Sequence, residues 1–297
     1  MSNHILKYAK YPAIVLMLAG SFFSCKDENH EPEKFRLSKV LYYAKTTTVN
    51  PTDGVEYAYD EEGNMVRESF YKYSPNAELF MYREFEYVGS QKTKMSIFRE
   101  DQGTIKLSWY VDYSYANNRL VKEELREADD WLSSTTDYEY QDGNLIREYY
   151  LEVYYGDFDE AKYTYDHQNR LVQVEKNSSE KIDYKYTTHL YDNEDREKTI
   201  TYYDANWDLL RTVEKSYNGR SQLPVKELHY DNNGIQTAQY QHFYDKLGHL
   251  VETRLNGNCP LFKRKYNGDL LMEEIVYTKP ERGCVEDETM RYEYQKY

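Results

Sequence analysis

The chain has 297 residues, 35 of them tyrosine, and carries a formal net charge of −14. This acidic balance argues against nucleic acid as a partner, because phosphate binding needs a basic surface. It also argues against an electrostatic contact with a membrane surface. Tyrosine favours the pleated, half-buried environment of a β-sheet. The composition therefore predicts a folded chain whose apolar surface is aromatic rather than aliphatic.

Residues 1–24 have the features of a segment that is removed on secretion. Lys7 and Lys10 form a basic start, and residues 13–23 are an apolar run. The run is shorter than the about 20 residues that a membrane-spanning helix needs, and it fits the apolar part of a signal peptide. Removal of this segment takes away two lysines and shifts the net charge from −14 to −16.

Cys25 follows the small residue Ser24 at the end of the apolar run. This arrangement resembles a lipoprotein signal, in which a peptidase cleaves before a cysteine that becomes diacylated. Phe22 and Phe23 depart from the usual Leu-Ala pair, so the box resembles the looser version of Bacteroidetes lipoproteins. The acidic residues that follow, in 26–28, resemble the signal that sends such proteins to the outer face of the outer membrane.

The resemblance implies a lipid anchor in the outer membrane and exposure on the cell surface. Several acyl chains would hold the protein firmly, because each buried CH₂ contributes about 0.8 kcal/mol. Residues 25–34 then form the lipidated cysteine and a polar tether, and residues 35–297 form one domain. An ordinary signal peptide with a coincidental cysteine is the alternative to lipidation, and a periplasm-facing anchor is the alternative to surface display.

A repeated aromatic-x-Tyr pattern organises residues 35–297. Its second aromatic recurs at intervals of 22 to 28 residues, at Tyr59, Tyr87, Tyr115, Tyr140, Tyr165, Tyr191, Tyr217, Tyr244, Tyr266 and Tyr294. A fixed period of this size is typical of repeat architectures, and half of it fits one strand with one turn. Residues two apart on a strand share a face, so we expect the paired aromatics to form ladders across a sheet.

Two kinds of turn separate the predicted strands. In Tyr-Asp-x-x-Gly, as at 59–63, the aspartate can accept bonds from the turn backbone while glycine takes the left-handed position. Trp207 stands where such a glycine is required after Tyr203-Asp204, so we expect that turn to close differently. The second kind is a two-residue hairpin turn that favours type I′, predicted at Asp142-Gly143, Asn218-Gly219 and Asn267-Gly268.

The pattern Tyr-x-Tyr-Asp-x-x-Gly followed by an apolar pair, as in 57–66, resembles the YD (RHS) repeat. The resemblance covers roughly Val55 to Leu271 and implies β-hairpins that wind into sheets or shells. The predicted fold is therefore all-β: an antiparallel hairpin meander of about 20 strands, elongated or curved, that curls or closes partly over an aromatic interior. The only helix-like stretch, 120–132, is also expected to be a strand.

Cys259 and Cys284 remain after Cys25 is assigned to the lipid. In an oxidising envelope, two cysteines about one repeat apart predict a disulfide between neighbouring strands. Two free thiols are the alternative. Metal binding by two isolated cysteines is a weak hypothesis.

The residues that could carry chemistry have simpler structural explanations. His189, His229 and His242 fall just before repeat tyrosines and look like substitutions at ladder positions, although His229 and His242 could meet at a metal. His249 follows a turn glycine and is expected to be exposed. The turn aspartates are expected to cap turns rather than bind calcium, and no pair of carboxylates stands out for glycosidase chemistry.

Three tryptophans are the candidates for stacking on a ligand, although tryptophan is more often a core residue: Trp109, Trp131 and Trp207. No phosphate-binding or catalytic motif is present, and we predict no catalytic residue, cofactor or metal. We expect a non-enzymatic outer-membrane surface lipoprotein that binds or scaffolds a protein or glycan ligand. A glycan-binding lipoprotein of a nutrient-uptake system is the second hypothesis, and a surface hydrolase is the third.

Overall fold

The computed structural model describes residues 34–44, 50–73, 76–257, 259–278 and 284–296. The predicted signal peptide and Cys25 lie outside these residues. The described chain forms β-strands and turns, and none of it is a helix long and apolar enough to cross a membrane. The strands are β1 (Phe35–Ala44), β2 (Asp53–Tyr59), β3 (Met65–Tyr73), β4 (Ala77–Val88), β5 (Gln91–Asp101), β6 (Thr104–Ala116), β7 (Arg119–Glu127), β8 (Leu132–Gln141), β9 (Asn144–Glu152), β10 (Phe158–Tyr165), β11 (Leu171–Ser178), β12 (Tyr186–Tyr191), β13 (Glu197–Tyr203), β14 (Leu209–Tyr217), β15 (Pro224–Asp231), β16 (Gln236–Tyr244), β17 (Leu250–Leu255), β18 (Cys259–Asn267), β19 (Leu270–Thr278) and β20 (Val285–Lys296).

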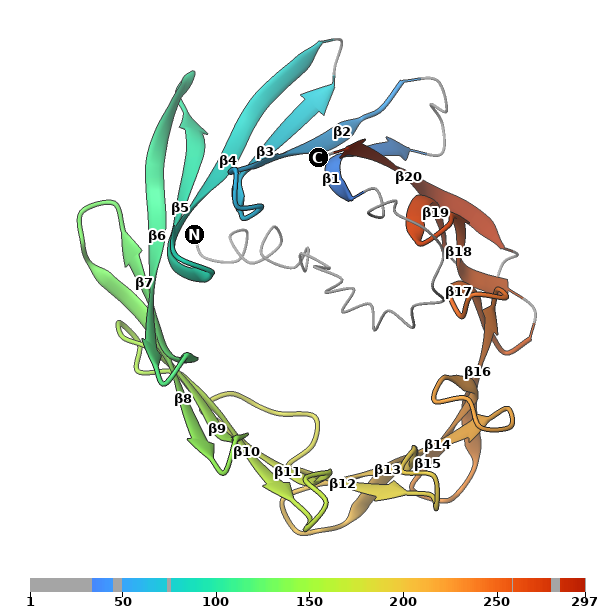
Figure 1. The fold of residues 1–297 in the computed structure, drawn as a ribbon. Coiled ribbons are helices and arrows are strands. Elements are labelled where there is room, and N and C mark those ends of the chain that lie inside the picture. The colour runs from blue at the N-terminus through green and yellow to red at the C-terminus, as the bar shows by residue number, and fades with distance from the viewer. Residues whose placement is uncertain (1–33, 45–49, 74–75, 258, 279–283, 297) are drawn as a thin grey trace, which may run out of the picture. The chain divides into compact units, whose positions relative to one another are not determined.

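The twenty strands form one antiparallel meander that closes on itself (Figure 1). Each strand pairs with its neighbours in sequence, and β1 pairs both with β2 and with β20. The first and last strands join over nine paired positions, from Phe35 opposite Lys296 to Ala44 opposite Glu288. The predicted all-β hairpin meander is confirmed, and its closure is complete rather than partial. Closure removes the free edges that a meander would otherwise expose.

The Tyr-Asp turns fold as their chemistry predicts. In the turn between β2 and β3, the Asp60 carboxylate accepts a bond from the Asn64 backbone N–H at 2.7 Å, and Gly63 adopts a left-handed φ of 94°. Asn169 and Asp195 take the same position in their turns with φ values of 61° and 60°. The aspartates therefore act as turn caps.

The turn between β13 and β14 closes in the same way, so the prediction that it must close differently is wrong. Trp207 takes the left-handed position with a φ of 66°, and the Asp204 carboxylate accepts bonds from the Asn206 and Asp208 backbone at 2.8 and 3.0 Å. A non-glycine residue in this conformation costs roughly 1–2 kcal/mol. The chain thus keeps a bulky tryptophan at a position where glycine would be unstrained.

The two-residue turns are less uniform than predicted. Asp142 and Gly143 both have positive φ, as a type I′ turn requires. At Asn267-Gly268, only the glycine has positive φ, and the two strands pair up to Asn267 opposite Leu270. The turn residues there are Gly268 and Asp269, so the predicted type I′ turn is wrong at this position. It is also wrong at Asn218-Gly219, where Asn218 lacks a positive φ and the strands pair only up to Tyr217 opposite Pro224.

A β-bulge follows almost every turn and repeats through the sheet. Tyr115 pairs with Leu120 while Ser114 pairs with Lys122, so that Val121 is the extra residue. Equivalent register shifts occur in the other hairpins that carry a repeat tyrosine. Bulges bend a strand and increase its twist. Their repetition gives the sheet the regular curvature that its closure requires.

The sheet has two chemically different faces. The repeat tyrosines all share one, which we call the tyrosine face, and most buried side chains lie on it. They include Val40, Val55, Glu68, Phe85, Val111, Ser134, Thr187, Val213 and Thr253. Side chains converge on the concave side of a curved sheet, so we infer that the tyrosine face points inward and the opposite face outward. No described large side chain is fully buried, as expected because a barrel of this strand number is too wide for side chains to fill.

The repeat tyrosines are connected from hairpin to hairpin through their hydroxyls. Tyr191, for example, donates to the backbone carbonyl of Leu171 at 3.0 Å, and Leu171 is itself the partner of Tyr165 across the hairpin. Eight other repeat tyrosines make the equivalent bond: Tyr59, Tyr87, Tyr115, Tyr165, Tyr217, Tyr244, Tyr266 and Tyr294. The recurring contact is therefore hydroxyl to carbonyl, not the ring-on-ring ladder that we predicted.

This tyrosine girdle, defined by those nine residues and Tyr140, runs around the whole sheet. Tyr59 bonds to Leu37 at 2.8 Å, and Leu37 faces Tyr294, which joins the last repeat to the first. Cations reinforce the girdle: Arg170 lies 4.8 Å from the ring centre of Tyr191, and Arg196 lies 4.6 Å from that of Tyr217. Except at Tyr140, whose hydroxyl has no hydrogen-bond partner among the described residues, the girdle links each hairpin to the previous one independently of the strand ladders.

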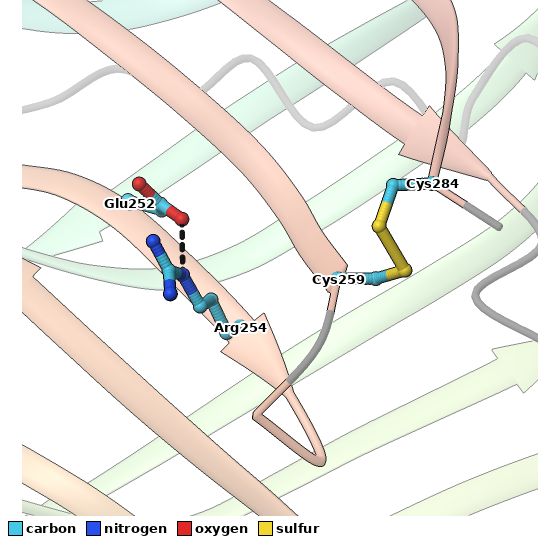
Figure 2. Close-up of a disulfide and its surroundings, with 4 residues drawn as sticks. All are labelled: Glu252, Arg254, Cys259 and Cys284. Atoms are coloured by element: carbon cyan, nitrogen blue, oxygen red, sulfur yellow. Dashed lines mark hydrogen bonds and ion pairs between the residues drawn. A yellow bond between two sulfur atoms is a disulfide. The ribbon is translucent and has the colours of Figure 1, made fainter.

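Cys259 and Cys284 form a disulfide, with their Cα atoms 5.3 Å apart. The bond joins the start of β18 to the residue before β20, the two strands that pair with either side of β19 (Figure 2). On the adjacent β17, the same view shows Arg254 donating to Glu252 at 2.5 Å. The disulfide thus ties together strands near the seam where the sheet closes.

We expect the double variant Cys259→Ser/Cys284→Ser to lose about 3 kcal/mol of unfolding free energy, because the bond closes a loop of 25 residues. Urea denaturation of the wild type and the variant, without reductant, measures this difference. Mass mapping under non-reducing conditions should recover the two cysteines in one linked peptide pair. Two alkylated thiols in the native protein would contradict the expectation.

Candidate binding surface

The tyrosine face carries a band of ionisable groups on β3 to β9. Glu68 is 4% exposed and pairs with Arg83 at 3.2 Å. Burial raises the pKa of Glu68, although Arg83 acts in the opposite direction. Burial likewise raises the pKa of Glu123, whose carboxylate accepts a bond from Tyr138. Each acid thus has its own partner, and the band lines the interior as a set of pairs.

A second polar cluster on the tyrosine face contains the three predicted ladder histidines. His189 contacts Glu197 at 2.6 Å, and Lys215 also pairs with Glu197. His229 and His242 approach the two carboxylate oxygens of Glu227, each at 3.7 Å. The sheet therefore brings His229 and His242 together, as we considered from the sequence.

This histidine cluster does not form a metal centre. Among the described residues, no group of three or more histidine, cysteine, aspartate or glutamate side chains is placed to hold a metal ion. His242 bonds instead to the Thr253 hydroxyl at 3.0 Å, and His229 packs against the ring of Tyr240 with the ring centres 4.9 Å apart. The histidines occupy positions in the polar lining of the tyrosine face.

His249 is half-buried, so the prediction that it is exposed is wrong. Its imidazole stacks on the Tyr266 ring at 4.6 Å and contacts the Asp245 carboxylate at 2.9 Å. It occupies the position that Arg170 and Arg196 hold in other repeats. His249 is half-buried because the residue at this position after a turn packs on the ring of the next repeat tyrosine.

The structure separates the three tryptophan candidates. Trp109 lies within β6 on the tyrosine face, half-buried opposite Ile97. Trp131 lies in the turn between β7 and β8 and is 57% exposed. Trp207 is 47% exposed and stacks on the Tyr186 ring, with ring centres 4.1 Å apart and planes at 11°. Only Trp207 belongs to a cluster of aromatic rings, because Tyr203 also lies 5.4 Å from it.

Exposed aromatic side chains gather at one edge of the sheet. Because the strands alternate in direction, the turns that follow odd-numbered strands all lie at the same edge. Four exposed aromatics occupy three of these turns: Trp131, Tyr154, Tyr155 and Trp207. We call them the aromatic edge. Tyr154 and Tyr155 are 72% and 67% exposed, which makes them available to a partner.

The sequence pointed to this edge only in part. Trp207 stands where the repeat pattern requires glycine, and this departure identified a residue that the structure places in a cluster of aromatic rings. Tyr186 gave no such signal, because its contact with Trp207 depends on the pairing of β12 with β13, which sets Tyr186 opposite Tyr203. The same pairing aligns the threonines of these strands, and nothing in the linear sequence marks them as neighbours.

No protein-family model matches the sequence, and neither does any curated protein. Among solved structures, the fold is similar to that of TcdB2-TccC3, with 11% identity and a TM-score of 0.49 over 82% of this chain and 15% of that one. It is also similar to a porin-like protein from Bacteroides uniformis, with 9% identity and a TM-score of 0.36 over 89% of this chain and 99% of that one. A porin-like protein from Bacteroides vulgatus matches at 13% identity, with a TM-score of 0.25. At these identities the likeness concerns the fold alone.

Proposed function

We propose that this protein is a non-enzymatic binding or scaffold module that a lipid on Cys25 holds at the surface of the outer membrane. The aromatic edge is the observation that supports binding. Water-exposed aromatic rings cost free energy, and their concentration on one surface is typical of interaction sites. The closed sheet supports the same proposal, since it holds successive turns in fixed positions without a free strand edge.

A glycan ligand is favoured over a protein ligand by one specific observation. Trp207 presents an indole ring that is backed by Tyr186 and remains 47% exposed. Such a flat, supported ring suits the apolar face of a sugar. A role in capturing glycans for uptake is therefore the more specific form of the proposed function.

Replacement of Cys25 tests the anchor. We expect wild-type protein to partition into detergent, to incorporate a labelled fatty acid and to be digested by proteinase K on intact cells. Cys25→Ala should lose the label and leave the membrane fraction, because one substitution removes the only attachment site for the acyl chains. An alanine variant that remains membrane-bound would contradict the anchor, and digestion only after cell lysis would indicate a periplasm-facing protein.

Replacement of the aromatic edge tests binding. Full-length protein in detergent micelles is immobilised and exposed to envelope extract of the same cells. A variant with alanine at Trp131, Tyr154, Tyr155 and Trp207 serves as the comparison. We expect the wild type to retain material that the variant does not. Equal retention by both proteins would show that the edge is not the binding surface.

A further inference from the structure

The outward face of β12, β13 and β14 carries few charged side chains. Other parts of the outer surface have ion pairs across the strands, as where Arg147 on β9 bridges Glu139 at 2.5 Å and Glu160 at 2.6 Å. On these three strands, two successive cross-strand rows hold no charged side chain. The rows are Tyr186–Tyr203–Leu209 and Thr188–Thr201–Thr212.

The threonine row continues onto the neighbouring strands without a charge. Thr188 pairs with Gln173 on β11, and Thr212 pairs with Tyr230 on β15. Among the described residues, the hydroxyls of Thr188, Thr201 and Thr212 have no side-chain hydrogen-bond partner, and all three side chains are partly exposed. Five adjacent strands thus present hydroxyl or amide groups in a line that crosses the strands.

Trp207 closes one end of this uncharged surface. It lies over the Tyr186–Tyr203 row, with its ring centre 4.1 Å and 5.4 Å from the two tyrosine rings. It does so from a left-handed backbone position with a φ of 66°. Strained residues of this kind are concentrated at functional sites, where the strain persists because the side chain is needed. The equivalent positions in other turns hold Gly63, Gly234 and Gly248, so a strain-free residue was available.

We propose that this surface, the Trp207 platform, binds a neutral polysaccharide chain. It consists of Trp207, Tyr186 and Tyr203 as stacking rings, with Thr188, Thr201 and Thr212 as hydrogen-bonding groups. The C–H face of a sugar packs on the indole, and sugar hydroxyls exchange hydrogen bonds with the threonines. Adjacent strands are about 4.8 Å apart, which is close to the length of one hexose along an extended chain.

The absence of charged side chains from the two rows favours a neutral polysaccharide as the ligand. A basic or acidic partner would find no complementary charges on the two rows. A neutral glycan needs no such charges, and its C–H faces and hydroxyls match the exposed indole ring and the line of threonine hydroxyls. The proposal rests on the proposed binding function and names its ligand class and its position.

The test compares full-length wild-type protein with Trp207→Gly and Leu247→Ala. Affinity electrophoresis in nonionic detergent uses four neutral polysaccharides as probes (soluble starch, laminarin, mannan and xylan) and polygalacturonate as the acidic control. We expect at least one neutral probe to retard the wild type and polygalacturonate not to. Trp207→Gly should weaken that binding at least tenfold, whereas Leu247→Ala, which removes an exposed apolar side chain from the turn between β16 and β17, should bind as the wild type does.

Trp207→Gly keeps the test interpretable because glycine restores the residue that the other turns carry. Its melting temperature should equal or exceed that of the wild type, so lost binding cannot be ascribed to unfolding. The proposal is overturned if no neutral probe binds, if polygalacturonate binds equally well, or if Trp207→Gly binds like the wild type. These failures would leave intact the proposed function, which the Cys25→Ala and aromatic-edge experiments test separately.

Discussion

Replacing Tyr165, Tyr191, Tyr217 and Tyr244 together by phenylalanine is expected to lower the unfolding free energy by about 4 kcal/mol. Each hydroxyl donates to a backbone carbonyl at 2.7 to 3.0 Å, and a hydrogen bond of this kind contributes about 1 kcal/mol. The rings remain, so packing changes little. Urea denaturation followed by tyrosine fluorescence or circular dichroism measures the loss.

Tyr140→Phe is the matched control for the girdle. Tyr140 occupies the equivalent repeat position, and Arg119 lies 5.4 Å from its ring centre. Among the described residues, its hydroxyl has no hydrogen-bond partner. We therefore expect this single variant to be within about 0.5 kcal/mol of the wild type. A quadruple variant as stable as Tyr140→Phe would show that the girdle adds nothing to the strand ladders.

The girdle also predicts a loss of stability at alkaline pH. Burial raises the pKa of Tyr191, Tyr217 and Tyr244 above the ordinary value. A group whose pKa is higher in the folded state stabilises the fold below its unfolded pKa, about 10 for tyrosine, and that contribution is lost as the pH rises above it. The quadruple phenylalanine variant should therefore lose less stability than the wild type between neutral pH and the alkaline range.

Arg83→Met is expected to lower the unfolding free energy by about 3–5 kcal/mol at pH 7. The substitution removes the partner of Glu68, which lies at 3.2 Å and is 4% exposed, and leaves a buried carboxylate without its counter-charge. Lys92 is the only other cation that lowers the pKa of Glu68, and it is a weaker influence than Arg83. Chemical denaturation at pH 7 tests the magnitude.

The pH dependence of Arg83→Met identifies the mechanism. Burial raises the pKa of Glu68 and Arg83 lowers it, so removal of Arg83 raises that pKa further. Because the folded state then binds the proton more tightly than the unfolded state, the variant should regain stability as the pH falls through this pKa. Glu68→Gln/Arg83→Met should recover most of the loss at pH 7.

Lys106→Met provides the exposed counterpart. Lys106 pairs with Asp101 at 2.9 Å, and both side chains are more than half exposed, so its loss should cost less than about 1 kcal/mol. A loss in Arg83→Met no larger than in Lys106→Met would mean that Glu68 is not buried as described. A loss that does not change with pH would mean that packing, not charge, accounts for it.

The sequence predicted the parts of this fold that depend on neighbouring residues. Aspartate caps and left-handed positions, as at Asp60 and Gly63, are set within four residues of one another. The alternation of side chains between the two faces of a strand is also a local property. It predicted a strand over 119–127 despite the helix-forming composition of this stretch. Trp207 was wrongly expected to change its turn, because the stacking on Tyr186 that offsets its strain lies on another strand.

By itself, the sequence determined that hairpins repeat, where they turn and which residues share a face. Only the tertiary structure decided that the sheet closes, because closure depends on the summed twist and bulges of twenty strands and on the pairing of residues as distant as Leu37 and Tyr294. It also decided the acceptors of the girdle, which lie one hairpin upstream of each tyrosine. For the same reason, it alone could align Thr188, Thr201 and Thr212 across three strands. Turns and strand faces depend on residues that are close in sequence, whereas the register between strands is fixed only when all of the strands pair.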